Sequence, residues 1–168
     1  MLLGFSKNGI IGLAVGDAMG VPLEFMIRER LQENIITDMI GYGSHDVPKG
    51  TWSDDTSMTL ATIDAIIKTG KIIPKDIADN FVEWVENAKY TPQNKVFDIG
   101  RTCLNAIMRY EEKNINAEEC GGESELSNGN GSLMRILPIA YYCYAKKLDD
   151  FEIFSIVKLV SSITHKHQ

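Results

Sequence analysis

Two adjacent carboxylates follow a hydroxyl residue where a loop is predicted to become a helix. Ser53, Asp54 and Asp55 stand just before an apolar run over residues 58–67. Carboxylate and hydroxyl oxygens are hard ligands of the kind that Mg²⁺ and Mn²⁺ prefer. The same residue types are favoured at helix N-termini, where they accept hydrogen bonds from free backbone N–H groups and oppose the helix dipole. The segment alone is therefore compatible with a metal site or with helix capping, and capping is the commoner case.

Two further groups contain side chains or backbone suited to a site. Glu24 follows a predicted helix exit and could act as an acid, a base or a water-orienting group, although a solvated loop carboxylate is the simpler interpretation. Residues 128–135, Asn-Gly-Asn-Gly-Ser-Leu-Met-Arg, run into a predicted helix, so their backbone N–H groups could seat a phosphate. The Asn-Gly pairs are equally well explained as turns, and no P-loop lysine follows them.

Two more segments invite a functional explanation. Within residues 98–102, Gly100 falls inside a helical pattern, at a cost of about 1 kcal/mol relative to Ala, and close approach of a ligand or helix would supply a reason. His165 and His167 end the last predicted helix, where polar or cationic residues favour the helix dipole without any ligand.

The elements that must position these groups are predicted to be helices throughout. Apolar residues recur at helical spacing almost everywhere, and no stretch alternates as a half-buried strand does, so we predict an all-α protein. The run after Asp55 is apolar on nearly all sides and predicts a central, buried helix stopped by Gly70. The predicted helices cover residues 9–20, 55–69, 74–88, 96–110, 133–146 and 150–165, and two long loops cover residues 21–52 and 114–131.

Two patterns refine these helices. Gly12, Gly16 and Gly20 share one face of the first helix, which predicts close approach of another backbone or a wall beside a ligand. Pro138 is expected to bend the helix over residues 133–146, and Phe154 is expected to point inward from the last helix.

Composition limits the classes of function. With 168 residues, 44% of them apolar, the chain has the size of a single domain over residues 1–168. A net charge of -6 argues against nucleic acid as the main partner. The three cysteines form no C-x-x-C pair, so neither a disulfide framework nor a zinc knuckle is indicated and a reducing cytoplasm fits best. The apolar stretch over residues 10–15 is too short for a signal peptide or membrane span, so no membrane partner is expected.

The five groups, in this order, resemble the ADP-ribosylglycohydrolase family, which includes the dinitrogenase reductase-activating glycohydrolase and the ADP-ribosyl-hydrolase proteins. The resemblance implies a compact orthogonal all-α bundle with a binuclear Mg²⁺ or Mn²⁺ site. It also implies hydrolysis of the glycosidic bond that links ADP-ribose to a protein side chain, of arginine or serine type, or to a small molecule. The matching segments are residues 16–18 with Glu24, 50–56, 98–100, 130–135 and 164–165.

The resemblance also implies a role for each matching residue. The metal ligands are Ser53, Asp54 and Asp55, and the catalytic acidic residues are Glu24 and, as a weaker match, Asp98. The substrate-binding residues are Gly100, Asn130, Gly131, Ser132, Met134, Arg135 and His165.

Family members are longer and have a second Asp-x-Asp-type ligand cluster in a C-terminal half. We therefore expect this chain to correspond to the N-terminal part of the family fold and to lack the remaining metal ligands. Three alternatives follow: a non-catalytic ADP-ribose-binding or structural relative, a fragment completed by a second chain, and self-association that covers exposed apolar surface. An all-α metal-dependent phosphohydrolase or isoprenoid-type pyrophosphate enzyme is a weaker rival, because Asp55 precedes Thr56-Ser57-Met58 and no Asp-Asp-x-x-Asp is formed.

Overall fold

The structure, a computed structural model, describes residues 2–33, 35–113 and 115–167. In these ranges helices follow one another without a named strand, so the prediction of an all-α fold is confirmed. The α-helices are α1 (Leu2–Gly20), α2 (Arg28–Glu33), α3 (Asp54–Thr69), α4 (Pro74–Asn87), α5 (Arg101–Lys113), α6 (Leu137–Lys146) and α7 (Asp150–Ser162). Three short 3₁₀ helices are η1 (Val21–Leu23), η2 (Ala117–Glu119) and η3 (Glu125–Ser127).

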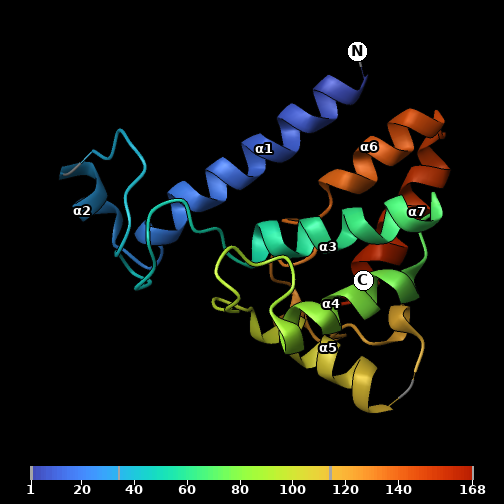
Figure 1. Ribbon diagram of the computed structural model, residues 1–168. Helices are drawn as coiled ribbons and strands as arrows, with labels where there is room; N and C mark the ends of the chain where they lie inside the picture. The colour runs from blue at the N-terminus through green and yellow to red at the C-terminus, as the bar shows by residue number, and fades with distance from the viewer. Residues whose placement is uncertain (1, 34, 114, 168) are drawn as a thin grey trace.

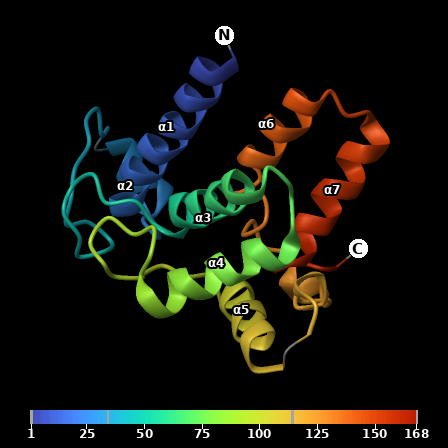
Figure 2. The same ribbon diagram turned by 45° about the vertical axis from the view of Figure 1, so that its right-hand side comes forward.

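Helix α3 is the central element of the bundle. Figures 1 and 2 agree that α1 and α6 lie on one side of α3 and that α4 and α5 lie on the other. The helix begins after Ser53, whose side chain accepts a hydrogen bond from the Asp55 N–H, and ends at Gly70, which has φ 68° and donates to the Ile66 carbonyl. Both ends agree with the sequence prediction, because a hydroxyl N-cap and a left-handed glycine are the usual start and stop signals.

The main core lies between α3 and the helices after it. Helix α4 contributes Ile77, Phe81 and Trp84, each fully buried, at the spacing of three and four that the sequence showed. Burial of aromatic and aliphatic side chains of this size stabilises a fold by about 1.5–3 kcal/mol each. This core anchors the C-terminal two thirds of α3. Other buried members are Met58, Ala61, Ala65, Ala78, Cys103, Ile107, Ala117, Ile139, Cys143, Val160 and Ile163.

Helix α3 is not apolar and buried on all sides, contrary to the prediction from the sequence. Thr59 and Thr62 are fully buried, and the Thr62 hydroxyl donates to the Met58 carbonyl at 2.8 Å, so a polar side chain is satisfied inside the core. Ile67, by contrast, is 74% exposed. The neighbouring Ile63 and Ile66 line an apolar groove that α3 forms with α1 and α6.

Two predicted helices begin later than expected. Helix α5 begins at Arg101, so Gly100 precedes the helix and the helix-interior cost predicted for it does not arise. Pro138 lies in the first turn of α6, where its missing N–H has no intrahelical partner to lose, so it starts the helix and does not bend it. The expectation that Phe154 points inward is wrong, because its side chain is 67% exposed.

The long connection from α1 to α3 is folded back on the end of α1. The Ser44 N–H donates to the Pro22 carbonyl at 3.0 Å, and the Tyr42 N–H donates to the Val47 carbonyl at 2.8 Å. A Cβ added at Gly43 would lie 2.0 Å from the Pro22 carbonyl oxygen, so only glycine permits this approach. The loop is therefore held against η1 by backbone contacts.

Two further observations concern the cysteines and the length of the apolar helices. The three cysteines are free and buried. Within the described ranges, no helix combines the length and the apolarity needed to cross a lipid bilayer.

Alanine substitution at two glycines should have opposite effects. Gly12 lies inside α1, where an added Cβ meets no described atom within 4 Å. We therefore expect Gly12→Ala to raise the free energy of unfolding by about 0.5–1 kcal/mol. Gly43→Ala should lower it by about 1–3 kcal/mol, because backbone atoms must move apart. Urea denaturation measures both, and a neutral Gly43→Ala would contradict the docking of this loop.

Candidate functional site

The carboxylate of Asp17, in the last turn of α1, binds the N-terminus of α3. It accepts hydrogen bonds from the Ser53 N–H at 3.0 Å and hydroxyl at 2.8 Å, and from the Thr56 N–H at 2.9 Å and hydroxyl at 2.6 Å. A carboxylate that takes the free N–H groups of another helix caps that helix and opposes its dipole. Asp17 therefore fixes the direction in which Asp54 and Asp55 leave the first turn of α3.

Asp54 and Asp55 are crowded by other acidic groups. Burial, followed by the charges of Asp55 and Asp98, raises the pKa of Asp54 to about 7, and a hydrogen bond from the Gly100 backbone acts in the opposite direction. Burial, followed by the charges of Asp17 and Asp98, raises the pKa of Asp55 to about 6. The charged groups with the largest effects on both are acidic, so this side of the site has uncompensated negative potential.

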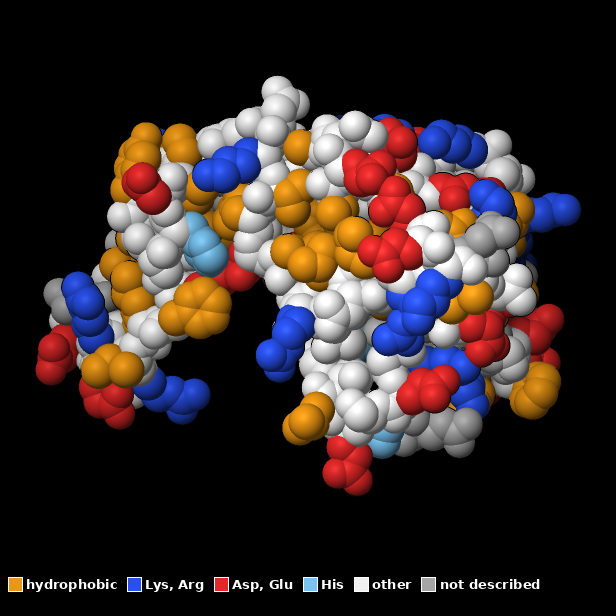
Figure 3. All heavy atoms as spheres, turned by 90° about the horizontal axis from the view of Figure 1, so that it is seen from below, with side chains coloured by type: hydrophobic (Ala, Val, Ile, Leu, Met, Phe, Trp, Pro, Cys, Tyr) orange, Lys and Arg blue, Asp and Glu red, His pale blue; other side chains and the backbone are white. Residues whose placement is uncertain are grey.

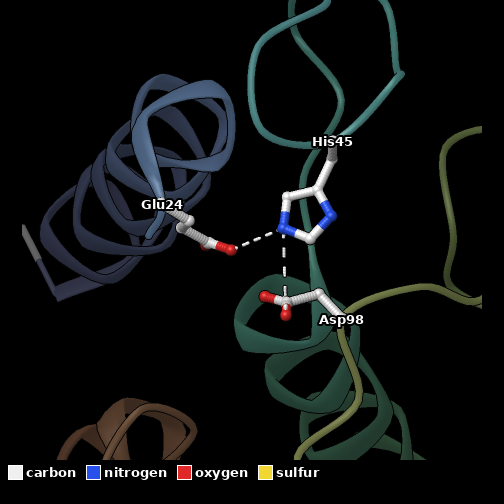
Figure 4. A group of neighbouring side chains, drawn as sticks. All are labelled: Glu24, His45 and Asp98. Carbon is white, nitrogen blue, oxygen red and sulfur yellow. Dashed lines mark hydrogen bonds and ion pairs between the residues drawn. The ribbon is translucent and has the colours of Figure 1, made fainter. Parts of the chain in front are cut away.

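Glu24 and Asp98 meet at one histidine. Glu24 is the residue after η1, and its Oε2 lies 2.7 Å from Nε2 of His45, which in turn lies 3.9 Å from Oδ1 of Asp98 (Figure 4). Burial is the main cause that raises the pKa of Glu24 to about 7, a hydrogen bond with Asp98 adds to it, and His45 lowers it. These three side chains each offer one ligand atom within 4.8 Å of the others.

A hollow of about 300 Å³ joins several of the predicted residues. Its lining includes Glu24, Asp55 and Met134, which come from segments far apart in the sequence. Figure 3 shows a deep notch in this face of the molecule, with acidic side chains at its closed end and a histidine beside them. Gly16 and Gly20 also line the hollow, and a Cβ on either would meet no described atom within 4 Å. The predicted close backbone approach is therefore absent at these two glycines, which leave the hollow open.

A second group lies around His165. A Cβ on Gly131 would be 2.7 Å from Cε1 of His165 and 2.5 Å from Sγ of Cys103, so the Asn-Gly loop packs directly on the imidazole. Nδ1 of His165 lies 2.8 Å from the Thr164 hydroxyl, and burial, followed by the charge of Arg135, lowers the pKa of His165. The structure therefore brings Gly131 and His165 together. Asn130 is exposed beside them, where its carbonyl accepts from the Met134 N–H at 3.0 Å, and Ser132 is half-buried.

Arg135 lies in the core and not on the wall of the hollow. It is fully buried, its Nη2 donates to the Thr164 hydroxyl at 2.7 Å, and both terminal nitrogens contact the Val160 carbonyl. Its guanidinium carbon lies 4.9 Å from the centre of the Phe81 ring. Burial lowers the pKa of Arg135 to about 10. In this position Arg135 supports the Thr164–His165 pair from behind, and its guanidinium has no open path to a ligand.

Two residues at the site were missed by the assignment of roles from the sequence. Asp17 stood in a matching segment but received no role. The signal that could have identified it is a carboxylate near the end of an apolar helix. His45 lay inside the long loop over residues 21–52, and loops of this length are more often functional than accidental.

Known proteins are similar to this chain in sequence and in fold. The sequence model of the ADP-ribosylglycohydrolase family matches residues 6–168. An ADP-ribosylarginine hydrolase of Pseudomonas putida is 34% identical over 137 residues, which cover 82% of this chain and 36% of the relative. The ADP-ribosyl-dinitrogen reductase glycohydrolase of Rhodospirillum rubrum is 32% identical over 162 residues, which cover 95% of this chain and 51% of that protein.

A solved structure, titled an ADP-ribosylglycohydrolase-related protein complex, superposes with a TM-score of 0.70 at 27% identity. The match covers 94% of this chain and 48% of that one. The chain thus spans about half, or less, of the length of these relatives.

Asp17→Asn should destabilise the fold. Asparagine keeps one acceptor oxygen but places an NH₂ group against donors from Ser53 or Thr56, so we expect a loss of about 2–4 kcal/mol in the free energy of unfolding. Urea denaturation provides the measurement, and Asp38→Asn is the control, since Asp38 is exposed and bonds its neighbouring N–H. Equal stability of the two variants would contradict the capping role.

The stability of the metal-free protein should fall as the pH rises. Because the folded pKa of Asp54 is raised from 3.8 to about 7, the native state holds this proton more tightly than the unfolded chain. Its contribution is complete below about pH 4 and is lost as the pH rises through about 7. In EDTA, Asp54→Asn should reduce the loss of unfolding free energy between pH 5 and pH 8 by about 1–3 kcal/mol.

Asp64 on the same helix supplies a control of opposite sign. The Tyr90 hydroxyl, followed by Lys68, lowers the pKa of Asp64 to about 2, so its ionised form stabilises the fold above about pH 4. Asp64→Asn should therefore lower stability at pH 8. Parallel pH profiles for Asp54→Asn and wild type would contradict the electrostatic account.

Proposed function

The chain belongs to the ADP-ribosylglycohydrolase family, and on this premise we propose that it takes part in metal-dependent hydrolysis of ADP-ribosyl bonds. The bond joins the anomeric carbon of ADP-ribose to a protein side chain or a small molecule. We favour an arginine-linked protein substrate over a serine-linked one, because one relative is named an ADP-ribosylarginine hydrolase. The net charge of -6 supports a substrate other than nucleic acid.

The observation that carries this proposal is the acidic pair at the start of α3. Asp54 is buried, and the pKa of each carboxyl is raised by burial and by further carboxylates, so a cation that neutralises the pair would relieve this cost. The donor set fits Mg²⁺ or Mn²⁺, since it consists of hard oxygens. Ser53 would add its hydroxyl oxygen, which donates its hydrogen to Asp17 and retains a lone pair.

Asp54, Asp55 and Ser53 would hold one side of the metal site. The further ligands would come from the part of the family fold that the match to the longer relatives does not include. When bound, the metal supplies a positive charge that binds ribose hydroxyls and stabilises developing negative charge. The rest of the reaction falls to side chains of this chain.

Glu24 has the protonation behaviour that the reaction needs. A carboxyl whose pKa is about 7 can accept a proton from water and return it at neutral pH. The water oxygen bonds to the anomeric carbon as the bond to the leaving nitrogen breaks, and the proton passes through Glu24 to the leaving group. Asp98, close to Glu24, adds negative charge that favours the oxocarbenium-like transition state.

The Asn-Gly loop is the proposed seat of the diphosphate. Asn130, Gly131 and Ser132 come from the turn that packs on His165, and the neutral imidazole leaves this wall without a charge that must be desolvated. Met134 would contact the sugar from the lining of the hollow. Gly100, whose N–H bonds Asp54, would keep the acidic pair beside the ribose.

Replacement of either carboxylate should abolish both metal binding and turnover. We expect Mn²⁺ at about 100 times its Kd to stabilise wild type by about 2.7 kcal/mol, with a rise in Tm of several degrees, and Asp54→Asn or Asp55→Asn to remove this rise. Release of ADP-ribose from an ADP-ribosylated arginine substrate should fall by at least about 100-fold.

The control is Asp76→Asn, the same substitution in the first turn of α4, which should leave both readouts at the wild-type level. Retained turnover in Asp54→Asn would refute the metal assignment. Binding of ADP-ribose without release by wild type would indicate a non-catalytic relative.

A further inference from the structure

The imidazole of His45 lies between the two proposed catalytic carboxylates. Figure 4 shows Glu24 and Asp98 approaching the same nitrogen, Nε2, from different elements of the fold. The distance to Glu24 Oε2 is 2.7 Å, which is a hydrogen bond, whereas Asp98 Oδ1 lies at 3.9 Å. A single N–H can donate to one acceptor at a time with good geometry, so its main partner is Glu24.

Backbone contacts hold His45 and Glu24 in one unit. The Ser44 N–H donates to the Pro22 carbonyl at 3.0 Å, and the Ser44 hydroxyl donates to the carbonyl of Glu24 itself. On the other side of the histidine, the Val47 N–H donates to the His45 carbonyl at 2.9 Å. The loop that contains the imidazole is thus bonded to the segment that contains the carboxylate.

Aromatic rings fix the plane of the imidazole. The ring of Phe25 lies 5.9 Å from that of His45 at 62°, and the ring of Phe97 lies 5.2 Å away at 56°. Each phenylalanine is the sequence neighbour of a catalytic carboxylate, since Phe25 follows Glu24 and Phe97 precedes Asp98.

The backbone at both contacts is strained. Phe25 has φ 60° and Asp98 has φ 53°, in the left-handed region that costs a non-glycine residue about 1 kcal/mol or more. These conformations accompany the convergence of both carboxylates on His45. Such strain persists where surrounding contacts over-determine the backbone.

We propose that His45 is a positioning residue, which donates Nε2–H to Glu24 and holds that carboxylate toward the attacking water. This inference rests on the proposed function. Without the donor, Glu24 loses the hydrogen bond to its Oε2, and it stays beside Asp98 with no N–H between them to offset the negative charge. The loss is expected in the chemical step, because the contact of His45 is with Glu24, the proposed acid–base group.

Two substitutions separate hydrogen bonding from packing. His45→Phe keeps a ring between Phe25 and Phe97 but removes the donor, whereas His45→Gln keeps an N–H donor and removes the ring. We expect His45→Phe to lower kcat for ADP-ribose release by roughly 10–100-fold with KM within about twofold, and His45→Gln to recover at least about a third of wild-type kcat. Asp46→Asn, an exposed neighbour in the same loop, should match wild type.

Two further measurements make the outcomes distinct. Long-range ¹H–¹⁵N spectra of the wild-type imidazole should show hydrogen on Nε2, and the Tm shift caused by Mn²⁺ should be the same in His45→Phe as in wild type.

An active His45→Phe together with an impaired His45→Gln would show a packing role and overturn the inference. Hydrogen on Nδ1 alone, or loss of the Mn²⁺ shift in both variants, which would make His45 a metal ligand, would overturn it as well. An inactive wild type would instead refute the proposed function.

Discussion

The hydrogen bonds that the Asp17 carboxylate accepts from the start of α3 are the constraint on which the site depends. A helix start has free N–H groups that need acceptors, and Asp17 supplies them from another helix while also receiving the hydroxyls of Ser53 and Thr56. One carboxylate thereby joins the last turn of α1 to the first turn of α3. It also determines where Asp54 and Asp55 point, because residues in the first turn of a capped helix have little freedom. The hollow follows from the same contact, since its lining includes Asp17 together with Asp55.

The site is electrostatically costly, and the core has to offset that cost. Burial and mutual repulsion raise the pKa values of Glu24, Asp54 and Asp55, so ionisation at neutral pH opposes folding. Left-handed backbone at Phe25 and Asp98 adds strain. The fully buried aromatic and aliphatic side chains of α4 belong to the core that Met58, Ala61 and Ala65 of α3 enter. The acidic pair lies in the first turn of α3 and the core lies along the later turns, and a divalent cation would reduce the cost where it is greatest.

Local signals made much of the fold predictable. The start and stop of α3 have side-chain and glycine signatures, and the apolar stripe of α4 is periodic, so both were predicted correctly. The errors arose where apolar spacing continued outside a helix: Ile99 fits the period of α5 but precedes its first residue, and Leu133 precedes α6. The cap supplied by Asp17 joins residues 36 and 39 apart in sequence, which no local pattern encodes. His45 was missed for the same reason, because its importance comes from two carboxylates that only the folded chain brings to it.

Residues in the matching segments differ in how they contribute. Arg135 belongs to one such segment, yet it is fully buried and contacts Thr164, whose hydroxyl lies 2.8 Å from His165. Because its guanidinium is held by neutral oxygens and an aromatic ring, its removal would loosen the wall on which the Asn-Gly loop packs, without removing a ligand contact. Asp17 acts similarly through the start of α3. A sequence segment shared with a family therefore identifies a site together with its supports, and burial distinguishes the two, since a side chain without access to the hollow can act on a ligand only through its neighbours.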